Sequence, residues 1–254
     1  MISYNAFGSG PQKVLVMHSW FCDNSSYAPL LPFIDPNEFT FLFMDLRGYG
    51  NSKEVNGKYT LQEAVEDAIR LTSGLNWNQF HILSHSMSTL IAQKIAITHE
   101  QKVKSLIGIN PIPPCGLSKS MELLSFLQEA ALSNESSALE GIHVLTNRKY
   151  SEYIAKKIVI NWHNCSTSKA RMAYLEMFAK TNFTKEAKGL KTPMLLIFGE
   201  DDYEEQEEAL QTSFLKLYSN AQLNLCKNAG HFPMQETPPL IATLITNFIY
   251  KNKT

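Results

Sequence analysis

The sequence has few cysteines, and they are not arranged as a site. The four are Cys22, Cys115, Cys165 and Cys226, which are far apart and form neither a C-x-x-C pair nor a Cys/His cluster. A thiolate metal site or a secreted disulfide framework would bring cysteines together at short spacings. The scattered thiols therefore indicate a reduced compartment, and we expect a cytoplasmic protein.

An excess of charge of either sign is also missing. The formal net charge is -1 at pH 7, and the lysines and arginines form no basic stripe. A surface that binds nucleic acid or anionic lipid would need a positive excess. No apolar run approaches the length of a membrane span, and residues 1–10 lack the basic and apolar regions of a signal peptide. We expect neither a nucleic-acid nor a membrane partner, and the sequence leaves the oligomeric state open.

What is present is the composition of a folded domain. The chain of 254 residues is 44% hydrophobic and 19% charged, and it contains no internal repeat or low-complexity segment. A chain of this length buries a large core and fits one α/β domain with a modest insertion.

Short apolar runs alternate with segments of helical spacing along most of the chain. The runs predict strands at 2–7, 14–17, 39–44, 80–83, 103–109, 194–198 and 222–226. The helical spacing covers 60–71, 87–99, 121–132, 151–162, 168–180 and 239–250. This alternation predicts an α/β fold, with a mostly parallel sheet covered by helices on both faces.

The alternation lapses between residues 111 and 190, where amphipathic helices dominate. Open α/β sheets bind ligands beyond the carboxyl ends of their strands, and a helical insertion can cover that edge. We therefore interpret 111–190 as a helical lid and assign 1–110 and 191–254 to the α/β core.

A serine lies at the most abrupt of the predicted turns. The apolar run 80–83 is followed by Ser84-His85-Ser86-Met87-Ser88 and then by a predicted helix. A strand that stops at Leu83 and a helix that starts near Met87 would leave the Ser86 hydroxyl exposed at the apex. The backbone N–H of Met87 would then be placed to bind a developing oxyanion. The alternative is a serine-rich turn that only caps a helix.

Five segments in this order resemble motifs of the α/β-hydrolase superfamily. They are His18-Ser19-Trp20, the loop from Asp45 to Ser52 with the pattern D-x-R-G-x-G-x-S, the turn at Ser86, Gly199-Glu200-Asp201-Asp202, and Gly230-His231-Phe232-Pro233. The resemblance covers the chain except for 111–190 and implies the α/β-hydrolase fold. Serine replaces the family's usual glycine at positions 19, 84 and 88, which predicts a slightly looser turn around the nucleophile.

The resemblance implies a catalytic triad of Ser86, Asp202 and His231, in the family's chain order. A serine hydroxyl is a poor nucleophile until an imidazole takes its proton and a carboxylate orients that imidazole. His231 is the candidate base because it follows the last strand, behind a glycine and ahead of a proline. The family places the acid three residues after the glycine, which selects Asp202, and Asp201 is the second choice.

The other six histidines have plainer interpretations. By resemblance His18 is structural, and His81 lies inside a predicted strand. His85 is expected to point away from Ser86 across the turn. Surface or packing roles are assigned to His99, His143 and His163.

The resemblance also implies that the backbone N–H groups of Trp20 and Met87 form an oxyanion hole. The acidic run at 200–208 has no recognisable metal-ligand spacing, and carboxylates near a helix N-terminus are favourable without a metal. We therefore expect neither a metal site nor a cofactor.

Apolar residues of the predicted lid indicate the kind of substrate. They are Leu123, Leu124, Phe126, Leu127, Trp162, Tyr174, Met177 and Phe178. About half would attach the lid helices to the core, and the rest would line an apolar pocket. We therefore expect a small molecule, a small or medium acyl or aryl ester. Arg148, Lys149 and Arg171 are interpreted as solvated charges, with recognition of a carboxylate or phosphate as the alternative.

Three functions follow from these features. The preferred one is a serine hydrolase that cleaves a carboxylic ester or thioester through an acyl-enzyme. Serine rather than aspartate at position 86 disfavours epoxide opening and dehalogenation, which family members perform with an aspartate. The same triad could instead cleave a carbon–carbon bond in a diketone or perform another acyl-transfer or lyase step. A non-enzymatic ligand receptor on a hydrolase scaffold is the third hypothesis.

Overall fold

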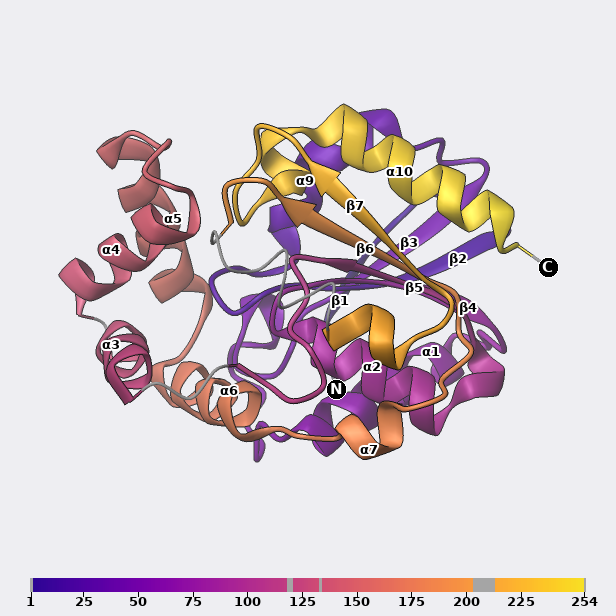
Figure 1. The fold of residues 1–254 in the computed structure, drawn as a ribbon, viewed down its shortest axis with the longest axis horizontal. Coiled ribbons are helices and arrows are strands. Elements are labelled where there is room, and N and C mark those ends of the chain that lie inside the picture. Colours follow the sequence, from indigo (N-terminus) through magenta and orange to yellow (C-terminus); the bar gives the residue numbers. More distant parts are fainter. Residues whose placement is uncertain (1, 118–120, 133, 203–212, 254) are drawn as a thin grey trace.

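A central sheet of seven strands organises the chain, as seen in a computed structural model that describes residues 2–117, 121–132, 134–202 and 213–253 (Figure 1). The strand order is β1-β3-β2-β4-β5-β6-β7. The strands are β1 (Tyr4–Phe7), β2 (Gln12–Met17), β3 (Phe39–Met44), β4 (Phe80–His85), β5 (Val103–Ile109), β6 (Met194–Gly199) and β7 (Ala221–Cys226). The edge strand β1 is antiparallel to β3, and the other pairs of these strands are parallel. The predicted mostly parallel sheet is confirmed.

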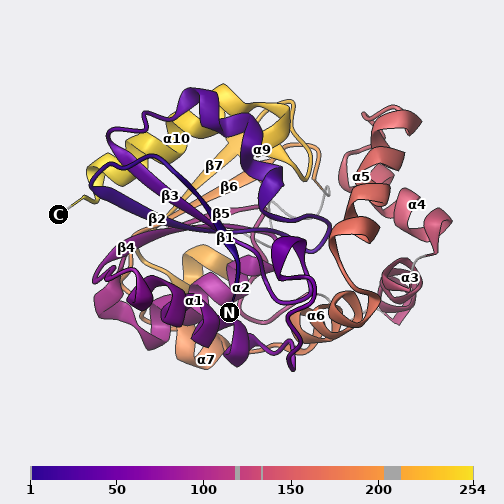
Figure 2. The ribbon, with the colours of Figure 1, turned by 180° about the vertical axis from the view of Figure 1, so that it is seen from behind.

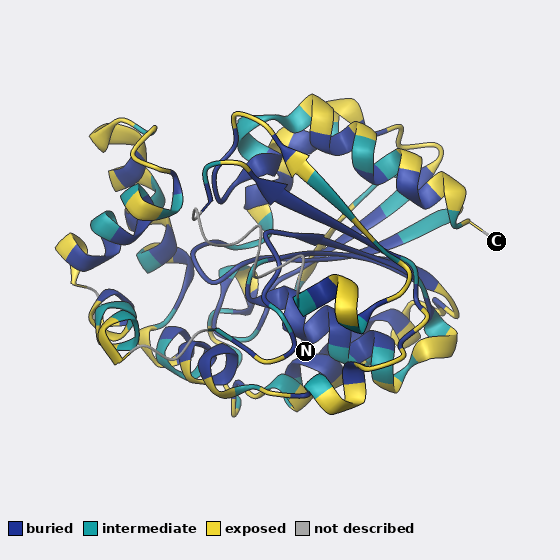
Figure 3. Ribbon diagram, viewed as in Figure 1, coloured by how far each residue is buried: buried dark blue, intermediate teal, exposed yellow. Residues whose placement is uncertain are grey.

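Helices cover both faces of the sheet, which is the predicted arrangement (Figure 2). One face carries the 3-10 helix η1 (Asn24–Phe33), α9 (Pro233–Glu236) and α10 (Pro238–Lys251). The other carries α1 (Leu61–Gly74), α2 (Ser88–Thr98) and α7 (Thr184–Ala187). Two short 3-10 turns are η2 (Gly50–Ser52) and η3 (Glu100–Lys102). The central strands between these layers are buried, whereas the outer surfaces of the helices are exposed (Figure 3).

Four further helices lie beyond the carboxyl ends of the strands (Figure 1). They are α3 (Met121–Ala131), α4 (Glu135–Leu145), α5 (Glu152–Cys165) and α6 (Ser168–Lys180). Three of them coincide with predicted helices, and α4 was not predicted. Because Asn134 caps its first turn and Ala138 and Ile142 are fully buried, packing stabilises α4 despite two serines and a glycine in its sequence. That these helices act as a lid stays a prediction.

The register of the parallel strands aligns their carboxyl ends at one edge of the sheet. Met17 pairs with Met44 and with Ser84, and His85 pairs with Ile109. On the other side of β5, the end of β6 pairs with the end of β7. The loops that follow β2, β3, β4 and β6 therefore all emerge at the edge that faces α3 to α6 (Figure 1).

The predicted end of one strand was wrong. Strand β4 continues to His85 rather than stopping at Leu83, because Ser84 and His85 pair with β5. The N-terminus of α1 is capped by Thr60, whose Oγ1 accepts a hydrogen bond from the Glu63 N–H at 3.2 Å. The Glu63 carboxylate accepts from the N–H groups of residues 58 and 59.

Candidate active site

Ser86 is the first residue of a two-residue turn between a strand and a helix. Strand β4 ends at His85 and α2 begins at Ser88, so the chain reverses within two residues. Ser86 has a φ of 53°, a left-handed conformation that side chains rarely adopt. Its N–H donates to the carbonyl of Ile109 at 2.9 Å, which holds the turn in place. Between Phe80 and Gln93 every residue except Ser86 is buried, and Ser86 itself is only partly exposed.

The serines that replace glycine around Ser86 are buried and hydrogen-bonded. The hydroxyl of Ser84 donates to the carbonyl of Ile107 at 3.2 Å. The hydroxyl of Ser88 accepts from the N–H of His85 at 3.0 Å and lies 2.9 Å from the carbonyl of Met17, to which it donates. These bonds tie β4 and α2 to the neighbouring strands. The added hydroxyls find acceptors and neither serine has a positive φ, which argues against the expected looser turn.

His231 and Asp202 form a buried hydrogen-bonded pair. The Nδ1 of His231 is 2.8 Å from a carboxylate oxygen of Asp202, and their side chains are 8% and 0% exposed. Because an ionised carboxylate only accepts hydrogen bonds, the proton of the neutral imidazole lies on Nδ1. The Nε2 then carries a lone pair, which is the state that a general base needs. The structure thus brings together two of the three predicted catalytic residues.

The neighbouring aspartate has a different partner. Asp201 forms an ion pair with Lys149, and the side-chain amide of Asn147 lies 3.5 Å from its other carboxylate oxygen. Asp202 alone of the two contacts the imidazole. Of the two predicted candidates for the acid, the geometry therefore favours Asp202. Most of the acidic run, residues 203–208, lies outside the described residues.

His85 links the serine turn to the loop that carries His231. Its Nε2 donates to the backbone carbonyl of His231 at 2.7 Å, and the two rings lie 4.9 Å apart. Burial lowers the pKa of His85 well below its ordinary value, so the ring is neutral, with its proton on Nε2. The sequence predicted only that His85 points away from Ser86, and the contacts of its ring with the carbonyl and ring of His231 were not predicted.

Asn110 makes a second link that sequence reasoning missed. It follows β5, and its side-chain amide donates to the carbonyl of Gly230 at 3.0 Å. Its amide oxygen accepts from the N–H of Gly199 at 2.8 Å. One side chain thus joins the end of β6 to the loop of His231. Asn110 is buried at the end of β5, between the strands that lead to Ser86 and to Asp202. A polar residue in this position was the signal that could have identified Asn110 from the sequence.

The predicted oxyanion-hole donors are available. Trp20 and Met87 lie in turns just after β2 and just before α2. Within the described ranges, neither backbone N–H donates to an acceptor in the protein. The bond from Ser88 to the carbonyl of Met17 holds these two turns together. Free backbone N–H groups are the kind of donor that an oxyanion needs, and that these two form an oxyanion hole stays a prediction.

His18 is structural, as expected. Its Nδ1 donates to the carbonyl of Ser19 at 2.8 Å, and its Nε2 accepts from the N–H of Leu46 at 3.1 Å. In the next loop, Asp45 accepts hydrogen bonds from the N–H groups of Asn24 and Asn51 at 3.1 and 2.9 Å. The first two resembling motifs therefore hold loops in place around the Trp20 turn.

The basic residues singled out in the sequence are held by protein groups. Arg148 forms an ion pair with Glu140, and Lys149 with Asp201. Arg171 is 2% exposed, so its interpretation as a solvated charge is wrong. It donates to the carbonyls of Ala131 and Ser166 and lies over the Trp162 ring, at 5.1 Å. Burial lowers its pKa from the ordinary value.

Aromatic rings extend from Trp20 into the helical segment. The Trp20 indole lies 4.8 Å from Trp162 and 5.6 Å from Phe178, and its N–H donates to the carbonyl of Arg171 at 2.9 Å. Phe21 lies 4.4 Å from Trp162. These residues are buried, so the predicted apolar packing between core and helices is present around Trp20.

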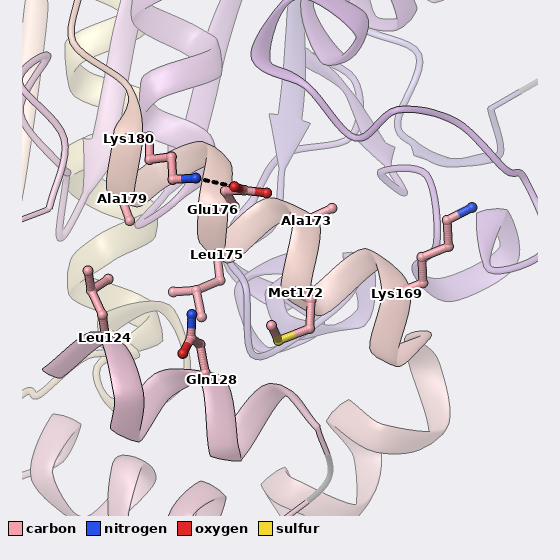
Figure 4. A pocket seen from close by; sticks show the side chains of 9 residues that line it. All are labelled: Leu124, Gln128, Lys169, Met172, Ala173, Leu175, Glu176, Ala179 and Lys180. Atoms are coloured by element: carbon pink, nitrogen blue, oxygen red, sulfur yellow. Dashed lines mark hydrogen bonds and ion pairs between the residues drawn. The ribbon is translucent and has the colours of Figure 1, made fainter. Parts of the chain in front are cut away.

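A separate groove of about 590 Å³ lies between α3 and α6 (Figure 4). The residues that line it are Leu124, Gln128, Lys169, Met172, Ala173, Leu175, Glu176, Ala179 and Lys180. None of them belongs to the predicted triad or oxyanion hole. This groove is therefore distinct from the edge of the sheet where Ser86 and His231 lie.

The described part of the chain has neither a metal-binding cluster nor a membrane-spanning helix. No cluster of three His, Cys, Asp or Glu side chains in that part of the chain could hold a metal ion. Within the same ranges, no helix has the length and apolar character to cross a membrane. The four cysteines are free thiols, and only Cys115 is exposed.

Comparison with known proteins agrees with this architecture. A family model described as the alpha/beta hydrolase fold matches residues 13–138. The chain is 29% identical over 194 residues to the human serine hydrolase-like protein 2, covering 74% of this chain and 59% of that protein. It is 22% identical to the pimeloyl-[acyl-carrier protein] methyl ester esterase of Aeromonas hydrophila, over 98% of this chain and 99% of the relative. The bromoperoxidase of Bacillus anthracis superposes with a TM-score of 0.86 at 17% identity, covering 98% and 95%.

The chain belongs to the α/β-hydrolase superfamily, which confirms the predicted family and fold. Its relatives include proteins named as hydrolases and an esterase. The chain spans 59% and 62% of the two human serine hydrolase-like proteins that it matches.

Proposed function

We propose that the protein is a serine hydrolase that cleaves a small or medium apolar carboxylic ester or thioester. The observation that carries the proposal is the buried pair of Asp202 and His231, whose free Nε2 lies in the loop that His85 ties to the Ser86 turn. A nucleophile, a base and a group that orients the base are the parts that acyl transfer needs.

In the first half of the reaction, Ser86 Oγ attacks the substrate carbonyl carbon while His231 Nε2 takes the hydroxyl proton. The carbonyl oxygen becomes an oxyanion, which the N–H groups of Trp20 and Met87 stabilise. Asp202 stabilises the imidazolium that forms. The intermediate collapses when its bond to the leaving group breaks, and the imidazolium gives its proton to the departing alcohol or thiol.

In the second half, water attacks the acyl group on Ser86 and gives a proton to His231 Nε2. The bond between Ser86 Oγ and the acyl carbon breaks, the proton returns to Oγ, and the carboxylic acid leaves. Both halves require His231 Nε2 within hydrogen-bond reach of Ser86 Oγ.

The preference for an apolar substrate comes from the surroundings of the proposed oxyanion hole. Trp20 is packed against Trp162 and Phe178, and Arg171 is buried with its donors on backbone carbonyls. One relative is named as an esterase for the methyl ester of a carrier-bound acyl group. Carrier-bound thioesters, and methyl esters of carrier-bound acyl groups, therefore belong among the compounds to test. A series of acyl esters and carrier-bound thioesters of increasing chain length would identify the preferred class, and a diketone would test carbon–carbon cleavage.

The decisive test is labelling with a fluorophosphonate followed by peptide mapping. We expect one adduct, on Ser86, and no adduct after unfolding. Ser86→Ala should abolish hydrolysis of 4-nitrophenyl acetate and leave the melting temperature nearly unchanged, since the Ser86 hydroxyl makes no hydrogen bond to any residue that the structure describes. Ser73→Ala, which changes an exposed serine of α1, is the control and should retain full activity. An active Ser86→Ala protein would place the nucleophile elsewhere, and a folded protein without an adduct would favour a receptor.

A further inference from the structure

The chain between α4 and α5 forms a tight corner at residues 145–149, which we call the α4 corner. Asn147 and Arg148 both have left-handed backbone conformations, with φ of 47° and 54°. The N–H groups of residues 146 to 148 donate to carbonyls of the last turn of α4, and the N–H of Lys149 donates to the carbonyl of Thr146. The corner is therefore a defined structure that projects from the helical segment toward the core.

The α4 corner contacts both loops that carry the base and the acid. The carbonyl of Leu145 accepts a hydrogen bond from the N–H of His231 at 2.9 Å. A Cβ on Gly230 would lie 2.9 Å from the same carbonyl and 3.0 Å from the Cα of Thr146, so the two backbones are in close contact. At the other loop, Lys149 forms its ion pair with Asp201, directly before Asp202 in the chain.

We infer that Lys149 is a positioning residue for the Asp202–His231 pair, an inference that rests on the function proposed above. The ammonium group of Lys149 holds the Asp201 carboxylate on the side of the α4 corner. Asp202, the next residue, then directs its carboxylate to the imidazole of His231. The ammonium group also neutralises the charge of Asp201. His231 then faces one uncompensated carboxylate, that of Asp202, instead of two.

The other charged and titratable groups around His231 come from three elements. His85 of β4 lies against the ring and is neutral. Glu236 of α9 accepts from the N–H groups of Gly230 and Phe232 at 2.9 and 3.0 Å. Burial and then the charge of Glu236 raise the pKa of Tyr150. Lys149 is the cation of the α4 corner that pairs with a carboxylate next to the acid.

Removing the charge of Lys149 should therefore change the protonation of His231 as well as its position. In Lys149→Met the unpaired negative charge of Asp201 favours the protonated, imidazolium form of His231. We expect the acidic limb of the kcat/KM profile for 4-nitrophenyl acetate to move to higher pH, and kcat at neutral pH to fall about tenfold with little change in KM. The NMR titration of the His231 imidazole, assigned with His231→Gln, should move in the same direction.

Lys156→Met is the matched control. It makes the same substitution in the same helical segment and breaks an ion pair with Glu152, and the two lysines are 47% and 41% exposed. The control should keep the activity, pH profile and titration of the parent protein. Both variants should melt within a few degrees of the parent, because exposed ion pairs contribute little to stability.

Asp201→Asn separates charge from geometry. It breaks the ion pair and leaves the Lys149 ammonium unpaired instead of the Asp201 carboxylate, so kcat should fall as in Lys149→Met while the acidic limb moves in the opposite direction, to lower pH. The double variant should lose no more activity than either single variant, and its His231 titration should match the parent.

The outcomes distinguish this inference from the proposed function. If the parent hydrolyses esters and Lys149→Met behaves like Lys156→Met in rate and titration, the positioning role is wrong and the function stands. If the parent hydrolyses no ester but the His231 titration moves in Lys149→Met alone, the positioning role stands and the function is wrong.

Discussion

Asp201 and Asp202 are chemically identical neighbours with different environments. Asp202 is buried and contacts the His231 imidazole, whereas Asp201 lies against Lys149 at the α4 corner. The family spacing selected Asp202 from the sequence, but the partner of Asp201 was not predictable, because Lys149 is 52 residues away in the chain.

The two aspartates should therefore differ sharply when each is changed to asparagine. Asp202→Asn retains the shape but gives the imidazole an amide in place of a carboxylate. We expect kcat for 4-nitrophenyl acetate to fall by about 10³- to 10⁴-fold. Asp201→Asn should cost about tenfold, through positioning alone. Equal losses in steady-state assays would show that the acid is not Asp202.

The elements that carry these residues meet through backbone contacts that only glycine permits. A Cβ on Gly199, at the end of β6, would lie 2.0 Å from the carbonyl of Gly230. The ends of β6 and of the His231 loop are therefore in van der Waals contact, and Asn110 bridges them. This contact sets the separation between the acid and the base.

Gly199→Ala should force these two segments apart. We expect the free energy of unfolding to fall by about 1–3 kcal/mol, as for other overpacked sites, and kcat to fall with it. Gly74→Ala is the control, because a Cβ at this last residue of α1 meets no atom within 4 Å. That change should be neutral or stabilise the protein by up to about 1 kcal/mol. Urea unfolding measures both, and a Gly199→Ala protein as stable as the parent would contradict the contact.

Most elements were predictable because their signals are local. The strand β3 and the strand β5 coincide with the predicted apolar runs, and α6 coincides with its predicted helical spacing. The extension of β4 to His85 was not predictable from its sequence, since Ser84 and His85 are polar and join the strand only by pairing with β5. The same applies to α4, whose burial against its neighbours outweighs its weak helix propensity.

Across the whole molecule, buried neutral histidines make stability depend on pH. His81 in β4 is fully buried, and its Nδ1 contacts the Ser105 hydroxyl at 2.8 Å. Burial, and then the charge of Lys104, lower the pKa of His81 from 6.5 to about 4. Between these two values the unfolded chain binds a proton that the folded protein does not bind, so stability falls as the pH falls.

This linkage predicts a specific loss of stability in acid. Between pH 7.5 and pH 5 the His81 contribution to the free energy of unfolding should decrease by about 2 kcal/mol. His81→Leu removes the titration, so its stability should depend less steeply on pH by that amount. Its loss of the Ser105 contact lowers stability equally at both pH values. Urea unfolding at the two pH values tests this, and parallel pH dependence in the two proteins would refute it.

The sequence by itself determined the fold class, the order of the motifs and the candidates Ser86, Asp202 and His231. The fold class depends on the periodicity of apolar residues, and the candidates depend on the resemblance of five short motifs, so each signal extends over only a few positions of the chain. Only the tertiary structure decided that Asp202 rather than Asp201 meets His231, that His85 holds the His231 carbonyl, and that the α4 corner contacts both loops. Those contacts join residues 29 to 146 positions apart, and their formation depends on how the strands and helices pack.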